Sequence, residues 1–131
     1  MPKIRVLIID DFALIRDFIR IGLQATSGQI EILEAANGRY AKAVLEGNPV
    51  DIVLCDWEMP DVNGQDLLIW VMEHERLKDL PFVMVTARSE RKHVVAALRA
   101  GADGYVVKPF SIETLAKQIQ SVLARKRGLV V

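Results

Sequence analysis

Side chains that can bind or transfer charged groups stand where apolar, strand-like runs of this chain stop. They are three carboxylates, one hydroxyl and one ammonium, at Asp10, Asp11, Asp56, Thr86 and Lys108. In an open parallel α/β sheet the carboxyl ends of the strands share one edge, and ligands bind in the crevice beside it. We therefore expect these five side chains to form one acidic pocket with a hydroxyl and an ammonium at its rim.

The three carboxylates indicate a metal site. Carboxylates that share a pocket repel one another unless a cation is bound. All-oxygen, carboxylate-rich sites favour hard ions, and a site with two or three carboxylates that also receives a phosphate suits Mg²⁺. The sequence therefore predicts Mg²⁺ as the cofactor, held by Asp10, Asp11 and Asp56.

Asp56 also has the chemistry of a nucleophile. A carboxylate can attack phosphorus and form an aspartyl phosphate when a metal and a cation neutralise the transferring group. Thr86 can donate a hydrogen bond to a phosphoryl oxygen, and Lys108 can pair with another oxygen as a compact point charge. The set predicts a phosphoryl-accepting site.

These side chains converge only if the strands that carry them lie in one sheet. Apolar runs and amphipathic stretches alternate along the chain: strands at 4–10, 30–35, 51–56, 82–86 and 104–107, and helices at 12–26, 38–46, 64–76, 89–100 and 112–125. Nearly continuous apolar strands are typical of a parallel sheet covered by helices on both faces. Right-handed crossovers then give an α/β fold, a doubly wound five-stranded parallel sheet with two helices on one face and three on the other.

Composition limits the other classes of function. The chain has 131 residues, which predicts one domain over residues 1–131 with its core at about 4–124. Its 17 Lys and Arg balance 17 Asp and Glu, so we expect no direct binding to nucleic acid. No apolar run approaches the ~18 residues of a membrane span, and the start has no signal-peptide core. We expect a cytoplasmic protein without membrane insertion. The single Cys55 excludes an internal disulfide.

Five motifs follow one another in order: Asp10-Asp11, Asp56-Trp57-Glu58-Met59-Pro60 with Asn63-Gly64, Thr86-Ala87, Gly101-Ala102-Asp103-Gly104-Tyr105 and Lys108-Pro109-Phe110. Together they resemble the receiver domains of bacterial two-component response regulators, most closely the stand-alone, chemotaxis-type receivers. The resemblance covers about residues 4–124. It implies the flavodoxin-like strand order 2-1-3-4-5 and a cis peptide bond before Pro109.

The resemblance assigns a role to each metal-site residue. In receivers, the residues at Asp11 and Asp56 bind Mg²⁺ directly, together with the main-chain carbonyl at Glu58. The residue at Asp10 acts through water.

The resemblance also implies a switch and a gate. Tyr105 is the switch residue and turns inward as Thr86 moves toward the phosphoryl group. Glu58 and Arg88 flank the mouth of the site. Because they carry opposite charges, we expect them to bridge the mouth, hinder the attacking water and lengthen the lifetime of the phosphoryl group.

The resulting hypothesis is a phosphorylation-controlled switch. A histidine kinase or phosphotransfer protein donates a phosphoryl group to Asp56, and a downstream protein binds the face made by the fourth helix, fifth strand and fifth helix. The protein catalyses its own phosphorylation and the slow hydrolysis of the aspartyl phosphate, but we expect it to act as a signalling switch and not as an enzyme. The sequence leaves open the cognate kinase, the output, the oligomeric state and whether a larger regulator was trimmed.

Three alternatives compete with this hypothesis. A phosphohydrolase of the haloacid-dehalogenase type needs an Asp-x-Asp pattern on its first strand, where this chain has Phe12 in place of the second acid. A flavodoxin-like electron carrier needs a phosphate-binding loop after that strand, where this chain has two acids. A receiver-like docking module that is never phosphorylated would not need all five key positions, which are intact here.

The remaining expectations concern helix faces and turns. His74 and His93 have no acidic or cysteine partner at ligand spacing and are expected to be exposed. The third helix turns Ile69 and Trp70 outward, where Trp70 could contact a partner. Gly64 and Gly101 are expected to supply positive φ.

Overall fold

The strands form one parallel sheet, as the sequence predicts. The structure, a computed structural model, describes residues 3–129. Its strands are β1 (Ile4–Ile9), β2 (Ile30–Ala35), β3 (Ile52–Cys55), β4 (Phe82–Thr86) and β5 (Gly104–Val107), in the order β2-β1-β3-β4-β5. This order confirms the one that the resemblance implied. It makes β1 and β3 neighbours, and β4 lies between β3 and β5.

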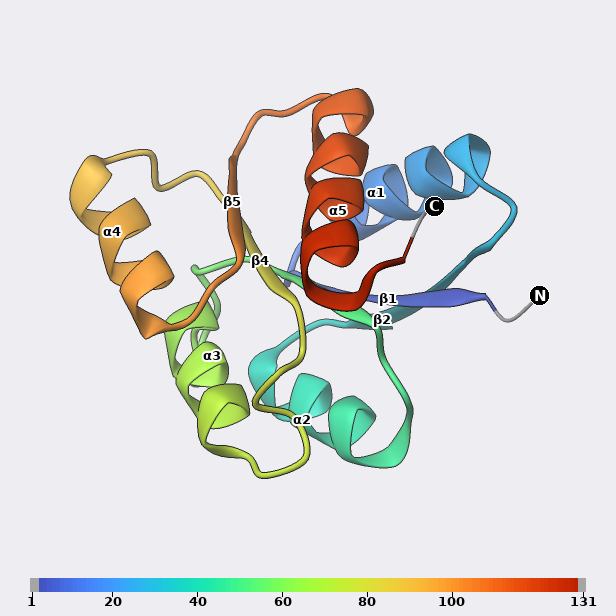
Figure 1. Cartoon of the computed structure of the whole chain (residues 1–131). Coiled ribbons are helices and arrows are strands. Elements are labelled where there is room, and N and C mark those ends of the chain that lie inside the picture. The colour runs from blue at the N-terminus through green and yellow to red at the C-terminus, as the bar shows by residue number, and fades with distance from the viewer. Residues whose placement is uncertain (1–2, 130–131) are drawn as a thin grey trace.

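Helices cover both faces of the sheet (Figure 1). They are α1 (Ala13–Thr26), α2 (Gly38–Gly47), α3 (Gly64–Glu73), α4 (Arg91–Ala100) and α5 (Ile112–Arg127). Helices α1 and α5 pack on one face, and α2, α3 and α4 pack on the other. The predicted division into two and three helices is confirmed. Within residues 3–129, no helix combines the length and apolar character needed to cross a membrane.

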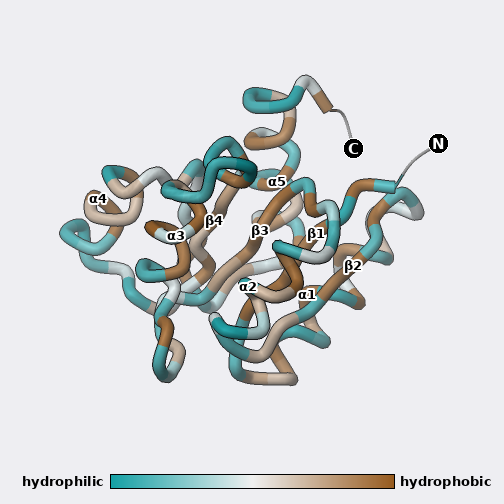
Figure 2. Tube along the Cα trace, turned by 90° about the horizontal axis from the view of Figure 1, so that it is seen from below, coloured by the Kyte–Doolittle hydropathy of each residue, from teal (hydrophilic) through white to brown (hydrophobic). Residues whose placement is uncertain are grey.

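The core consists of two apolar clusters that the strands separate. Successive strand side chains point to opposite faces, so Leu7 and Ile9 pack toward α2, α3 and α4, whereas Val6 and Ile8 pack toward α1 and α5. Figure 2 shows the result, with hydrophobic strands at the centre and hydrophilic segments around them. Because both faces are covered by helices, a ligand can approach the strand ends only at an edge of the sheet.

Helix ends follow the local sequence. Ser111 caps α5, since its hydroxyl accepts a hydrogen bond from the Thr114 N–H at 3.1 Å. Asn63 and Asp66 form a reciprocal capping box at the start of α3. Gly101 ends α4 with a φ of 116°, which confirms its expected left-handed conformation.

The third helix ends earlier than predicted, at Glu73 instead of residue 76. The His74 N–H donates to the Val71 carbonyl at 3.1 Å, a tighter turn than an α-helix makes. The chain then turns so that Leu77 and Leu80 are buried in the core beside the start of β4. Burial of these two side chains overrides the helical periodicity of the segment. The fourth helix begins at Arg91 instead of residue 89.

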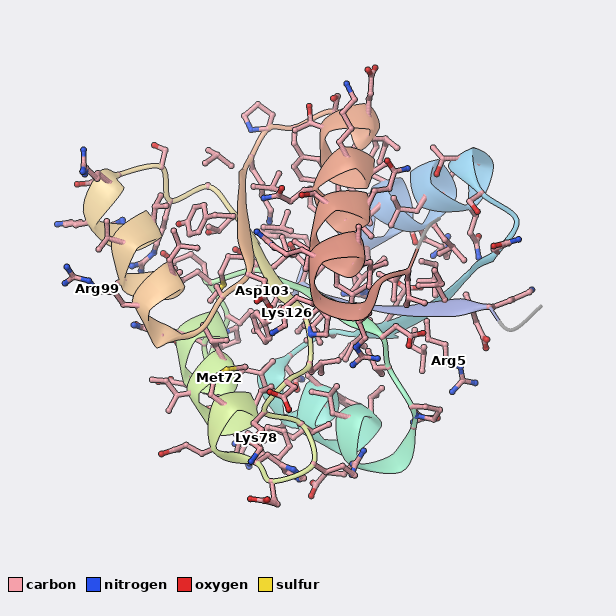
Figure 3. All side chains as sticks on the ribbon, in the orientation of Figure 1. Arg5, Met72, Lys78, Arg99, Asp103 and Lys126 are labelled. Atoms are coloured by element: carbon pink, nitrogen blue, oxygen red, sulfur yellow. The ribbon has the colours of Figure 1, made fainter. Side chains whose placement is uncertain are left out.

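The end of α5 is tied to the amino edge of the sheet. Lys126 Nζ lies 3.2 Å from Asp103 Oδ1, and the two residues lie close together in Figure 3. The other oxygen of Asp103 accepts the Phe82 N–H at 2.9 Å. Arg127 pairs with Asp51 at 3.4 Å, directly before β3. These contacts lie at the edge opposite to the carboxyl ends of the strands.

Candidate functional site

Three carboxylates meet at the carboxyl edge of the sheet. Asp10 and Asp11 follow β1, and Asp56 follows the neighbouring strand β3. One carboxylate oxygen from each lies within 4.8 Å of the other two. Asp10 and Asp56 are only 1% and 5% exposed, whereas Asp11 is exposed. The pocket therefore has a buried wall and one carboxylate that faces solvent.

Lys108 supplies the positive charge of the pocket. Its Nζ lies 2.6 Å from Asp10 Oδ2 and 3.2 Å from Asp56 Oδ2. Burial by itself lowers the pKa of the Lys108 ammonium, but the hydrogen bond to Asp10 and the charges of Asp10 and Asp56 outweigh burial and raise it. The lysine is thus held in its charged form between two buried carboxylates.

Main-chain groups fix the two buried carboxylates. The Phe12 N–H donates to Asp10 Oδ1 at 2.9 Å, and the Glu58 N–H donates to Asp56 Oδ1 at 3.3 Å. A Cβ atom on Gly64 would lie 2.3 Å from the Asp56 carbonyl oxygen. The expected positive φ at Gly64 is wrong. This position needs glycine because the start of α3 passes against the main chain of the loop after β3.

Thr86 lies at the end of β4, between the strands that carry Asp56 and Lys108. It is fully buried, and its hydroxyl accepts a hydrogen bond from the Arg88 N–H at 3.3 Å. The Lys108 N–H donates to the Thr86 carbonyl at 2.9 Å. The Lys108–Pro109 peptide bond is cis, as the resemblance implied. All five residues singled out from the sequence therefore stand at one edge of the sheet.

The side chains of Glu58 and Arg88 form an ion pair between the loops that follow β3 and β4. The hydrogen bond from Arg88 lowers the pKa of the Glu58 carboxyl, and the same bond raises the pKa of the Arg88 guanidinium. The guanidinium also lies over the buried ring of Trp57, 5.1 Å from its centroid. The two oppositely charged residues thus meet in the structure.

Tyr105 contacts the same loop from β5. Its ring is half-buried and packs against the core on the side of α2, α3 and α4. Its hydroxyl donates to the Arg88 carbonyl at 2.6 Å. Burial raises the pKa of this phenol. Arg88 is therefore the residue through which the Tyr105 hydroxyl contacts the loop after β4.

The expectation that both histidines are exposed is wrong. His93 is half-buried, and its ring lies edge-on to Trp57 with the centroids 5.5 Å apart. His74 lies 5.1 Å from the Trp70 ring, and its Nε2 is 4.0 Å from a Glu46 carboxylate oxygen. Trp57 and Glu46 come from other elements, so spacing along one helix did not reveal them. Trp70 stands four residues before His74, a helical spacing that the prediction did not use.

Trp70 is only partly outward. It is half-buried and packs against the core, and the Lys42 ammonium lies 5.4 Å from its ring centroid. Ile69 points outward as expected, at 42% exposure. Contacts within the domain therefore account for part of the Trp70 surface.

One surface beside the site is absent from the sequence predictions. Large apolar side chains of α1 and of the residue before it are strongly exposed: Phe12 (66%), Leu14 (81%), Phe18 (48%) and Ile21 (61%). We call this set the α1 apolar surface. The signal was present in the sequence, because the apolar residues of α1 are too numerous for one buried stripe.

The α1 apolar surface adjoins the acidic pocket. A groove of about 510 Å³ is lined both by Phe12 and Leu14 and by Asp56 and Lys108. A second groove, of about 440 Å³, extends the apolar lining to Phe18. Any protein that reaches the Asp56 carboxylate through the first groove must contact apolar side chains.

This geometry agrees with the comparison with known families. The model of the response regulator receiver domain matches residues 6–120. The chain belongs to the response regulator receiver family. This receiver is 40% identical over 124 residues to the chemotaxis protein CheY of Pseudomonas aeruginosa, which covers 95% of this chain and 99% of that protein. It is 36% identical over 123 residues to the chemotaxis protein CheY-3 of Vibrio cholerae, which covers 94% of each.

Solved structures support the same assignment. The receiver resembles the chemotaxis protein CheY4 of Vibrio cholerae with a TM-score of 0.86 and 32% identity, covering 92% of this chain and 99% of that one. A putative response regulator from Chloroflexus aurantiacus gives a TM-score of 0.88 at 30% identity, covering 95% of this chain and 100% of that one. The receiver is thus a CheY-like component of two-component signalling, as the sequence motifs predicted.

Proposed function

We propose that the receiver accepts a phosphoryl group on Asp56 from the phosphohistidine of a histidine kinase or phosphotransfer protein. The observation that carries this proposal is the position of Lys108, whose ammonium contacts both Asp10 and Asp56. A cation at this place can neutralise a phosphoryl group bound to Asp56. Family membership supports the same chemistry.

The donor set fits Mg²⁺. Asp10, Asp11 and Asp56 offer carboxylate oxygens close to one another, and hard divalent ions prefer such ligands. Asp11, Asp56 and the main-chain carbonyl of Glu58 would hold the ion, with Asp10 acting through water. When bound, Mg²⁺ supplies charge neutralisation for the phosphoryl oxygens.

The residues of the receiver carry the transfer itself. A carboxylate oxygen of Asp56 forms a bond to phosphorus as the bond from phosphorus to the donor imidazole nitrogen breaks. The imidazole takes up a proton from solvent and leaves neutral. Lys108 pairs with one phosphoryl oxygen, and the Thr86 hydroxyl donates a hydrogen bond to another. Positioning and charge neutralisation are most of what phosphoryl transfer requires of a protein.

The receiver acts as a switch, since the product is its own modified form. Water hydrolyses the aspartyl phosphate slowly and resets the protein. The Glu58–Arg88 ion pair flanks the approach of this water and lengthens the phosphoryl lifetime. Tyr105 and Thr86 convert the modification into a changed face of α4, β5 and α5, which a downstream protein binds.

The phosphodonor docks on the α1 apolar surface. Its histidine must reach Asp56, and the groove that leads there is walled by Phe12 and Leu14. Exposed apolar patches commonly mark protein interaction sites. Kinases draw the phosphoryl group from ATP, so this exchange takes place in the cytoplasm.

Beryllofluoride, a phosphoryl mimic, tests the proposal directly. With Mg²⁺ present, it should change the fluorescence of Trp57, which follows Asp56 in the chain. Asp56→Asn should abolish the response, and it should also abolish labelling by radioactive acetyl phosphate. Trp70 contributes a constant background, because it lies on the far part of α3. A full response in Asp56→Asn would assign the acceptor to another residue.

A further inference from the structure

Arg88 links the two hydroxyls of the proposed switch through its main chain. Its N–H donates to Thr86 Oγ1 at 3.3 Å, and its carbonyl accepts from the Tyr105 hydroxyl at 2.6 Å. Thr86 is at the end of β4, and Tyr105 is on the neighbouring strand β5 (Figure 1). A displacement of Arg88 therefore changes the surroundings of both hydroxyls at once.

The side chain of Arg88 is held from a third direction. Its Nε pairs with the Glu58 carboxylate, and its guanidinium lies on the face of Trp57. An exposed ion pair alone is weak, but the Trp57 ring is buried and therefore a rigid support. Ion pair and ring together fix the guanidinium in one place, so the loop after β3 determines where the loop after β4 stands.

The position of the Tyr105 side chain depends on the loop after β4. Tyr105 is half-buried, and a partly buried hydroxyl that loses its acceptor is costly to keep in place. The alternative is rotation about χ1 to another staggered well, where water can hydrogen-bond the hydroxyl. The carbonyl of Arg88 therefore selects between two positions of the ring.

We propose that Arg88 is the positioning residue for the half-buried position of Tyr105, and that Glu58 and Trp57 set the position of Arg88 through its side chain. The Glu58–Arg88 ion pair thus joins the mouth of the phosphoacceptor site to the face that binds the downstream protein. This role is additional to the proposed effect on phosphoryl lifetime. It requires neither Mg²⁺ nor a phosphoryl group.

Fluorine NMR of 3-fluorotyrosine tests this inference. The chain has two tyrosines, so Tyr40→Phe leaves Tyr105 as the single reporter. Arg88→Ala removes the side chain but keeps the carbonyl that accepts the Tyr105 hydroxyl. A changed signal in this variant therefore reports movement of the carbonyl and not loss of the acceptor.

We expect Arg88→Ala and Glu58→Ala each to move the signal toward the shift of exposed fluorotyrosine and to increase its H₂O-to-D₂O isotope shift. The double variant should match Arg88→Ala, because without the guanidinium Glu58 has no partner on this loop to hold. Arg88→Lys, which keeps a cation but loses the planar group over Trp57, should give an intermediate shift. If Arg88→Ala does not fold, Glu58→Gln replaces it.

Lys92→Ala is the matched control. It breaks the exposed pair between Lys92 and Glu90, four residues further along, without touching Arg88. This control should leave the signal unchanged. An unchanged signal in Glu58→Ala and Arg88→Ala, or additive shifts in the double variant, would overturn the inference. The measurement uses unphosphorylated protein without Mg²⁺, so failure of the proposed phosphoacceptor role would not affect its outcome.

Discussion

The ammonium of Lys108 lies 2.6 Å from the carboxylate of Asp10, which is almost completely buried. The lysine also contacts Asp56, so one cation balances two carboxylates before any phosphoryl group arrives. Removing one partner of a buried ion pair leaves an uncompensated charge, which is strongly destabilising. The pair therefore makes the stability of the receiver depend on the cations in its pocket.

Lys108→Ala should lower the free energy of unfolding by about 3–5 kcal/mol without Mg²⁺. Added Mg²⁺ should restore most of this loss, because it supplies the missing positive charge. Urea unfolding with and without Mg²⁺ measures both quantities. Metal affinity should survive in Lys108→Ala and fall sharply in Asp11→Ala. An equal loss of affinity in the two variants would contradict the roles proposed for them.

Breaking the ion pair at the mouth should shorten the phosphoryl lifetime. Glu58→Ala and Arg88→Ala should each speed hydrolysis about two- to fivefold, the rate change that corresponds to the ~0.5–1 kcal/mol of an exposed pair. The double variant should be no faster than either single one, since both remove the same contact. The decay of radioactively labelled protein gives the rates. Additive accelerations, or none, would mean that the pair does not restrict water.

Polar substitutions on the α1 apolar surface should slow transfer from a phosphorylated kinase. Leu14→Ser with Phe18→Ser removes apolar contact area for the donor while leaving the pocket intact. The rate of phosphorylation by acetyl phosphate, which needs no docking surface, should stay the same. Leu14 is strongly exposed and Phe18 half-exposed, with its ring centroid 5.9 Å from that of Phe110, so stability should fall only modestly.

Tyr40→Ser provides the comparison for that experiment. Tyr40 is as exposed as Phe12, at 66%, but stands on α2. It should have no effect on either donor. Equal slowing by Tyr40→Ser and the α1 double variant would attribute the effect to general loss of apolar surface.

Gly64→Ala should damage the site through the main chain. The added Cβ would lie 2.3 Å from the Asp56 carbonyl oxygen, which cannot yield without moving the phosphoacceptor loop. We expect a loss of about 2–4 kcal/mol in unfolding free energy and a weaker fluorescence response to beryllofluoride. Gly47→Ala is the control, because a Cβ there meets open space. It should be neutral or stabilise by about 0.4–1 kcal/mol.

The pocket could be predicted from the sequence because each of its residues is recognised by its position relative to a single strand. A polar residue directly after an apolar strand lies at the carboxyl edge of a parallel sheet, whatever the length of the connections. Asp56 and Lys108 could therefore be predicted to lie in one pocket without any knowledge of the distance between them. The strand order could not be predicted in this way, because periodicity does not show which strands are neighbours. It was predicted from the resemblance to the receiver family.

Contacts between elements were not predictable in the same way. His93 meets Trp57 because α4 crosses the sheet at a particular angle, and no spacing along α4 encodes that angle. The end of α3 was misplaced because burial of Leu77 outweighed helical periodicity. No role was predicted for the exposed side chains of α1, because apolar character alone does not distinguish a buried face from a binding surface.

The anchored end of α5 has a practical consequence for binding measurements on immobilised protein. Arg127 pairs with Asp51 at the amino edge of the sheet, and β1 begins at Ile4 on that same edge. A linker joined near either described end therefore leaves the opposite edge, with Asp56 and the Phe12 end of the α1 apolar surface, turned toward the solution. The receiver can be immobilised on a sensor chip by either end while its phosphodonor still has free access.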